Sequence, residues 1–191
     1  MLAVVEIIEA IRSRLKDDNY TNLRFSDMEL LDTLNTALSA LILEFKLNKH
    51  QISLEIKDNQ PIYIDNLLGI ECAYFNNALI ECTSVPTDQL SLVVDQSSLS
   101  IEPFTQGHLR LTYYANEPIA SLDHYLRVPA LAKNALIYDC LGKLLEIPTN
   151  ENNPNTIALY KQLLKEAKNT LTLHLNNLYG RNYYFSKVVR V

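Results

Sequence analysis

The sequence contains no tryptophan and only four glycines among its 191 residues, and no two of these glycines lie close together. A loop that cradles a phosphate group needs clustered glycines, because its backbone N–H groups must come close to the anion. The G-x-G-x-x-G and Walker patterns are absent, and so is the G-x-S-x-G turn of serine hydrolases. The usual nucleotide-binding and serine-hydrolase motifs are therefore excluded.

Cysteine and histidine are also scarce. The cysteines Cys72, Cys82 and Cys140 are odd in number, lack metal-ligand spacing and lie in apolar stretches. We expect them to be buried, unpaired side chains in a reducing compartment. The four histidines form no H-E-x-x-H motif and no zinc-ligand spacing with a cysteine. We therefore expect no metal and no cofactor, and the sequence assigns no set of acid, base and nucleophile.

Long uninterrupted apolar runs are missing as well. Residues 1–11 are partly apolar, but Glu6 and Glu9 interrupt them, and neither a basic segment nor a cleavage site flanks them. No run is long and apolar enough to cross a bilayer. The composition, 48% hydrophobic and 20% charged, is that of a globular domain. We expect a soluble, intracellularly made protein without a membrane contact.

The net charge of −5 is unevenly distributed. Residues 51–125 carry two basic and ten acidic side chains, whereas residues 181–191 carry three basic and no acidic ones. Such asymmetry bears on partners rather than on the fold. We expect the acidic block to face a channel or a partner and not to bind DNA, because phosphate binding depends on many lysine and arginine side chains.

Helical spacing of apolar residues predicts four helices, at about residues 2–17, 27–47, 129–146 and 154–179. The strongest start signal precedes the second helix, where Ser26 and Glu29 form the S-x-x-E pattern of a capping box. Phe25 lies at the preceding position, as in a hydrophobic staple. Asp17 is interpreted as part of a helix stop. Arg12 lies off the apolar stripe of the first helix.

Between the two helical pairs the apolar period changes to two, the period of a β-strand. Strand candidates at about 51–57, 62–64, 70–75, 78–83, 90–94, 98–101 and 109–114 are separated by short turn sequences. We expect mainly antiparallel pairing. The predicted fold is α+β: a single domain over residues 1–180, with a four-helix bundle-like core and an antiparallel β-rich insertion at about 51–116.

Residues 181–191 follow Gly180, a residue suited to end the last helix, and are predicted to form an extended tail. We expect this tail to be a docking arm that adds a strand to an exposed sheet edge. A disordered terminus, or nucleobases stacked on its aromatic side chains, are the alternatives. The residues expected to dock are Arg181, Tyr183, Tyr184, Phe185, Lys187, Val189 and Arg190.

Two patterns near the N-terminus occur together. Arg12 to Asp17 reads R-x-x-L-x-D, and Phe25 opens an aromatic-S-D-x-E-L-L sequence that is followed by Leu34 and Asn35. This combination resembles the opening of the head–tail adaptor proteins of tailed bacteriophages, also called connector or head-completion proteins. Phe25 stands where that family often has tryptophan. The rest of the chain resembles the family in the order of its elements more than in its letters.

The resemblance implies a structural, non-enzymatic role. Proteins of this family form rings beneath the portal of the capsid, extend the DNA channel and dock the tail. The resemblance thus implies a ring, expected to be a dodecamer, with the portal protein and a tail or tail-completion protein as partners. It implies DNA that passes without sequence-specific binding. It also implies location in the virion, after assembly in the host cytoplasm of a phage or prophage.

Two other functions stay open at this point. The first is a cytoplasmic helical binding module with a β insert, which takes a peptide or a small ligand. The second is an enzyme whose site is assembled from dispersed residues and uses Cys140 or His124. A deep polar pocket with perturbed titratable groups would favour the enzyme.

Overall fold

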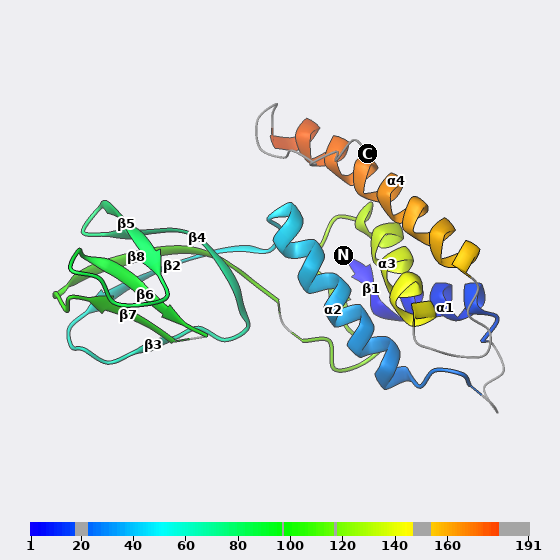
Figure 1. Ribbon diagram of the computed structural model, residues 1–191, viewed down its shortest axis with the longest axis horizontal. Coiled ribbons are helices and arrows are strands. Elements are labelled where there is room, and N and C mark those ends of the chain that lie inside the picture. The colour runs from blue at the N-terminus through cyan, green and yellow to red at the C-terminus, as the bar shows by residue number, and fades with distance from the viewer. Residues whose placement is uncertain (18–22, 97, 117, 147–153, 180–191) are drawn as a thin grey trace. The chain divides into compact units, whose positions relative to one another are not determined.

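The computed structural model describes residues 1–17, 23–96, 98–116, 118–146 and 154–179 (Figure 1). The fold is α+β, with four helices and a curled seven-stranded mixed sheet. The chain divides into two compact units. The helical unit comprises Met1–Leu41 and Ile119–Val191, and the β unit comprises Ile42–Pro118. None of the described helices combines the length and the apolar character needed to span a bilayer.

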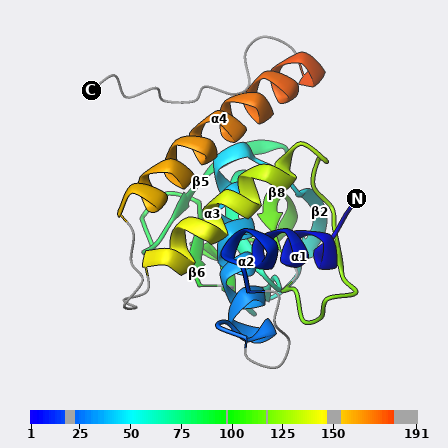
Figure 2. The same ribbon diagram turned by 90° about the vertical axis from the view of Figure 1, so that its right-hand side faces the viewer.

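Four helices carry the apolar stripes predicted for them: α1 (Val4–Leu15), α2 (Asp27–Phe45), α3 (Ala132–Glu146) and α4 (Pro154–Tyr179). In the helical unit, α3 lies between α1 and α4 and packs against both (Figure 2). The buried side chains of the stripes include Val4, Ile8, Ile11, Leu30, Leu34, Leu38, Leu41, Ala135, Leu141, Leu171 and Leu175. Burial of these side chains is the main source of stability for helices of this length.

The helix ends differ from the prediction in four places, one of which is the end of α1 at Leu15 instead of residue 17. Leu2 and Ala3 do not begin a helix but form β1 (Leu2–Ala3), which pairs antiparallel with β9 (Tyr125–Leu126). The third helix begins at Ala132, and Pro129 lies in the preceding turn, where its carbonyl oxygen accepts a hydrogen bond from the Ala132 N–H at 2.9 Å. The second helix ends at Phe45, and Lys46 follows with a left-handed φ of 53°.

All seven predicted strands are present: β2 (Lys49–Ile56), β3 (Ile62–Tyr63), β4 (Leu67–Phe75), β5 (Ala78–Thr83), β6 (Ser91–Asp95), β7 (Ser98–Glu102) and β8 (Gly107–Ala115). Their order in the sheet is β2-β8-β4-β5-β6-β7-β3 (Figure 1). One core cluster takes side chains from both halves of this order, including Phe75, Leu92, Leu99, Leu109 and Leu111. Because strands far apart in the order share a core, the sheet encloses one of its own faces.

The turn between β4 and β5 shows how the sequence sets the register of a hairpin. Asn76 and Asn77 have φ angles of 49° and 68°, and Phe75 pairs with Ala78 across them. Positive φ at both central residues is the requirement of a type I′ turn, which asparagine tolerates. The Asn76 carboxamide also accepts a hydrogen bond from the His108 N–H at 2.8 Å, which ties the turn to β8.

One pairing departs from the mainly antiparallel pattern that the sequence predicts. β5 and β6 run parallel, with Glu81 opposite Ser91 and Thr83 opposite Val93, whereas the other pairs are antiparallel. Parallel neighbours usually need a dozen or more connecting residues. Here residues 84–90 suffice, because the pairing is short and the chain has to return over only two residues, about 7 Å. A short connection was therefore a misleading sign of a hairpin.

Truncation of a buried residue of α2 tests whether its stripe belongs to the core. Leu34 is fully buried, so Leu34→Ala should reduce the free energy of unfolding by about 2–5 kcal/mol, because it removes apolar contacts and leaves a cavity. Leu43→Ala on the exposed face of the same helix is the matched control and should cost much less. Urea titration measures both. A loss below about 1 kcal/mol for Leu34→Ala would show that the face is not core.

Candidate functional site

The end of α1 brings the two charged residues of the R-x-x-L-x-D pattern together. Lys16 takes a left-handed conformation (φ 56°) and its N–H bonds to the Ser13 carbonyl oxygen at 3.2 Å. The Asp17 N–H then reaches back to the Arg12 carbonyl oxygen at 2.9 Å. These two hydrogen bonds are those of a Schellman helix end. The helix end thus places residues five apart in the sequence on the same side of the chain.

Arg12 and Asp17 form a buried ion pair between these positions. Their side chains are only 5% and 3% exposed, and Arg12 Nη1 lies 2.9 Å from Asp17 Oδ2. The Asp17 carboxylate also accepts hydrogen bonds from two backbone N–H groups ahead of α2, from Arg24 at 2.7 Å and from Phe25 at 3.3 Å. Each charge therefore has several partners, which is the condition for burying it.

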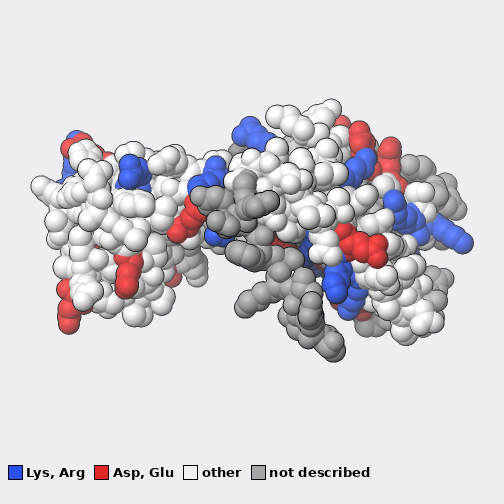
Figure 3. Space-filling view, turned by 90° about the horizontal axis from the view of Figure 1, so that it is seen from above, with Lys and Arg blue, Asp and Glu red and all other residues white. Residues whose placement is uncertain are grey.

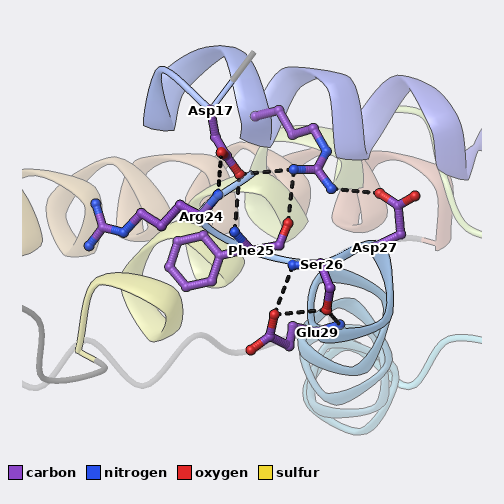
Figure 4. Close-up of polar contacts among 7 residues, drawn as sticks. Asp17, Arg24, Phe25, Ser26, Asp27 and Glu29 are labelled. Carbon is purple, nitrogen blue, oxygen red and sulfur yellow. Dashed lines mark hydrogen bonds and ion pairs between the residues drawn. The ribbon is translucent and has the colours of Figure 1, made fainter. Parts of the chain in front are cut away.

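The same guanidinium group holds the start of α2 (Figure 4). Arg12 donates to the Phe25 carbonyl oxygen at 3.0 Å and to Asp27 Oδ1 at 2.6 Å. In the next residues, Glu29 Oε2 accepts from the Ser26 N–H and from Ser26 Oγ, each at 2.8 Å, and the Glu29 N–H donates to Ser26 Oγ at 3.3 Å. These are the reciprocal contacts of the predicted capping box. We call this whole set of contacts the helix junction.

The helix junction corrects two readings of the sequence. Arg12, placed by the sequence off the apolar stripe of the first helix, is nevertheless buried; it is 4% exposed and lies at the centre of the junction. Asp17 does not compete for nearby backbone groups as a simple helix stop, because its carboxylate bonds to residues seven and eight positions later. The signal that could have revealed both was the five-residue spacing of opposite charges across a helix end.

Electrostatics supports the capping box as well. The hydrogen bonds from the Ser26 backbone and side chain lower the pKa of Glu29 below its ordinary value. Asp27 and Glu29 also lie in the first turn of α2, where the helix dipole favours negative charge. The carboxylates at this helix start are thus engaged in holding the helix.

The two residues considered for a dispersed enzyme site are used by the fold. Cys140 is completely buried in α3, and burial raises the pKa of its thiol to about 12, which leaves it protonated and unreactive at neutral pH. His124 lies beside β9, and its backbone carbonyl oxygen accepts a hydrogen bond from the Val4 N–H at 3.0 Å. Over the described residues, no group of three or more His, Cys, Asp or Glu side chains could hold a metal ion.

Only Cys140 meets the expectation of three buried cysteines, because Cys72 is half-buried and Cys82 departs furthest from it. It is exposed, and partial burial of its sulfur together with the neighbouring Cys72 raises the pKa of its thiol. It lines a hollow of about 390 Å³ in the β unit, which we call the β4–β5 hollow. The lining residues are Leu67, Leu68, Gly69, Ile70, Cys82, Thr83, Ser84, Val94 and Gln96. The predicted docking residues of the arm, at 181–190, lie outside the described part of the chain.

Loss of the central charge tests how far the helix junction stabilises the helical unit. Arg12→Met should cost about 3–5 kcal/mol, because it leaves the Asp17 carboxylate buried without its ionic partner. Arg14→Met, on the exposed face of the same helix, should cost less than about 1 kcal/mol. Urea unfolding of the variants measures these losses. If Arg12→Met and Asp17→Asn have strictly additive costs when combined, the two groups are not coupled.

The capping box has a separate test that depends on pH. Ser26→Ala should cost about 1 kcal/mol at pH 7, because a terminal N–H loses its acceptor. Glu29 has a lowered pKa in the folded protein, so its contribution is present above its ordinary pKa of 4.5 and is lost as the pH falls through the folded value. The difference in melting temperature between Ser26→Ala and the parent should therefore shrink below pH 4. A difference that stays constant with pH would contradict this role for Glu29, and Ser13→Ala serves as the control.

Comparison with known proteins adds no assignment. No protein-family model matches the chain, and no curated protein matches it significantly.

Proposed function

We propose that this chain is a head–tail adaptor of a tailed bacteriophage or prophage, a structural protein and not an enzyme. In this role it forms a ring beneath the portal, extends the DNA channel and docks the tail. The observation that carries the proposal is the helix junction. Arg12, Asp17, Phe25, Ser26 and Glu29, the residues by which the chain resembles this family, all belong to that one connected set of contacts.

The proposed architecture is a four-helix bundle-like core with the β unit inserted between α2 and α3 and an arm over residues 181–191. The order of the elements supports it, since two helices precede the seven strands of the large sheet and two follow them. The packing of α3 between α1 and α4 supports it too. The arm is the part proposed to dock, through the residues from Arg181 to Arg190 named above.

The surface of α4 supports self-association into the ring, for which the family resemblance gives twelve copies as the expected number. α4 buries only Leu171, Thr172 and Leu175, whereas other apolar side chains along it are exposed. These exposed side chains are Leu159, Leu173, Leu178 and Tyr179. Exposed apolar groups on a helix that is packed on one side are available to a subunit interface. The proposed further partners are the portal protein and a tail or tail-completion protein, in the host cytoplasm during assembly and then in the virion.

The distribution of charge supports a channel through which DNA passes without sequence-specific binding. Lysine and arginine side chains on the face seen in Figure 3 are separated from one another, with acidic and uncharged side chains between them. A duplex-binding surface needs many basic groups along a continuous stripe. The β unit has ten acidic and four basic residues in its sequence, so it repels phosphates rather than retaining them.

The β4–β5 hollow favours a second candidate function, a binding module for a peptide or small ligand. Its volume of about 390 Å³ lies in the range of about 300–1,000 Å³ that is usual for ligand pockets. Mostly apolar side chains line it, together with a few polar groups. The two functions differ in one measurable property, because an adaptor must assemble into a ring and a binding module need not.

Measurement of mass tests the adaptor proposal. The purified chain, alone or mixed with its portal protein, should give a closed ring in native mass spectrometry. Removal of residues 181–191 should leave the melting temperature nearly unchanged and abolish association. A full-length chain that stays monomeric with and without the portal would contradict the adaptor function. A truncated chain that assembles as well as the full one would contradict the docking role of the arm.

A further inference from the structure

β4 and β5 separate after only three pairs of residues. Residues 73–75 of β4 pair with residues 78–80 of β5. Beyond that point, among the described residues, β4 pairs only with β8, and residues 81–83 of β5 pair only with β6. Residues 67–72 of β4 and residues 81–83 of β5 each have one side that faces the other strand. Within the described chain, no strand pairs with either of these two sides. The β4–β5 hollow lies between these two free sides.

The local structure of β4 makes its backbone accessible from the hollow. Two irregularities interrupt its pairing with β8, between Leu67 and Gly69 and between Ile70 and Cys72. Such bulges bend a strand and redirect its side chains. Four consecutive residues of β4, 67–70, line the hollow. A further strand could therefore reach both the backbone and the apolar side chains of this segment.

Acidic groups lie beside the hollow. Glu81 precedes Cys82, and Asp95 stands between Val94 and Gln96; both carboxylates are exposed. Across the residues that the structure describes, neither forms an ion pair. Lys49, a basic group at this end of the sheet, is already paired with Glu71. We call these two carboxylates, which belong to the strands that border the hollow and not to its lining, the acidic rim.

We propose that the β4–β5 hollow receives the arm, residues 181–191, of a neighbouring copy. The proposal rests on the self-assembly proposed above and names the surface that the arm uses. The arm carries three basic and no acidic residues, which complements the acidic rim. It adds a strand along residues 67–72, where main-chain hydrogen bonds provide affinity. Fully extended, its eleven residues span about 36 Å, which is more than pairing with the six residues 67–72 requires.

The side chains of the arm match the hollow as well. Tyr183, Phe185, Lys187 and Val189 occupy alternate positions, so an extended arm would turn three apolar side chains and one basic side chain to one side. That side faces the apolar lining, which has room for an aromatic group. The free side of β2, at one edge of the sheet, is another strand side with which an arm could pair, and the basic residues Lys49 and Lys57 there are both paired with carboxylates.

Cross-linking through Cys82 tests the contact directly. The full-length chain with Cys72→Ser keeps one exposed thiol, Cys82, because Cys140 is buried. Ser186→Cys or Lys187→Cys then places a second thiol on either side of the arm. A short bis-maleimide at mildly alkaline pH should produce a ladder of linked chains on a denaturing gel. Equal mixing with isotope-labelled chains should show by mass spectrometry that links join different copies.

The controls distinguish the hollow from other edges. Cys82→Ser should abolish the ladder, and Ser53→Cys, which moves the thiol to exposed β2 in the Cys82→Ser background, should not restore it. A ladder independent of Cys82, a ladder restored at position 53, or links only within one chain would overturn the proposal. The absence of any ladder in a chain that still assembles would overturn it too, while the adaptor function would stand. A chain that does not assemble at all would overturn both.

Charge reversal tests the complementarity. Glu81→Lys with Asp95→Lys should weaken self-association by about tenfold or more. Charge reversal in the arm, Lys187→Glu with Arg190→Glu, should by itself weaken self-association to a similar extent. Combined with Glu81→Lys and Asp95→Lys, it should restore self-association. Analytical ultracentrifugation measures both. Failure of the combined variant to regain association would overturn the charge pairing proposed here.

The matched control reverses two acidic residues at the far end of the sheet. Tyr114 pairs with both Lys49 and Gly69, so the hollow lies toward the start of β2. Glu55 and Asp58 are exposed at and beyond the opposite end of β2. Glu55→Lys with Asp58→Lys changes the net charge by the same amount and should leave association within about twofold. Equal weakening by this pair would show that net charge alone matters and would overturn the proposal.

Discussion

The helical unit depends on one buried ion pair, that between Arg12 and Asp17. Moving two charges out of water costs several kcal/mol each, and their attraction offsets this only when their other hydrogen-bonding positions are also satisfied. Here the partners come from the end of α1, from the backbone ahead of α2 and from Asp27. A shift in the path of the chain would leave a charge without a partner. The pair therefore fixes where α2 begins and buries Phe25 against the core.

The core of the β unit differs from the helix junction, because it contains no buried charged side chain among the residues that the structure describes. Its sheet curls so that side chains from both ends of the strand order share one apolar core. Two bulges interrupt the pairing of β4 with β8, and β4 pairs with β5 over only three residues. Two strand segments of the curled sheet are therefore left with free sides. The β4–β5 hollow lies between these segments and is an open position for a further strand.

Periodicity predicted most of this fold, because it reports which side of a segment is apolar. It located the seven strands of the large sheet and the apolar faces of α1 and α2. Periodicity failed where the structure of a segment depends on the segment that it contacts. The direction of β6 beside β5, the pairing of β1 with β9 and the burial of Arg12 depend on contacts that leave no period in the sequence. Cys82 was misread for a related reason, since its apolar neighbours lie beside a hollow rather than in a filled core.

Charged groups lie in two kinds of environment in the described part of the chain. The buried ion pair of Arg12 and Asp17 has its remaining hydrogen-bonding positions filled by other groups of the protein. The carboxylates of Glu81 and Asp95, on the strands that border the hollow, are exposed and form no ion pair among the described residues. The basic arm and the acidic hollow are different surfaces of one chain, so a contact between them is heterologous. Repetition of a heterologous contact from copy to copy gives a closed ring when the rotation between copies divides a full turn, and an open helix when it does not. A ring built in this way needs no symmetric interface, and its size follows from the angle that the arm and the hollow impose.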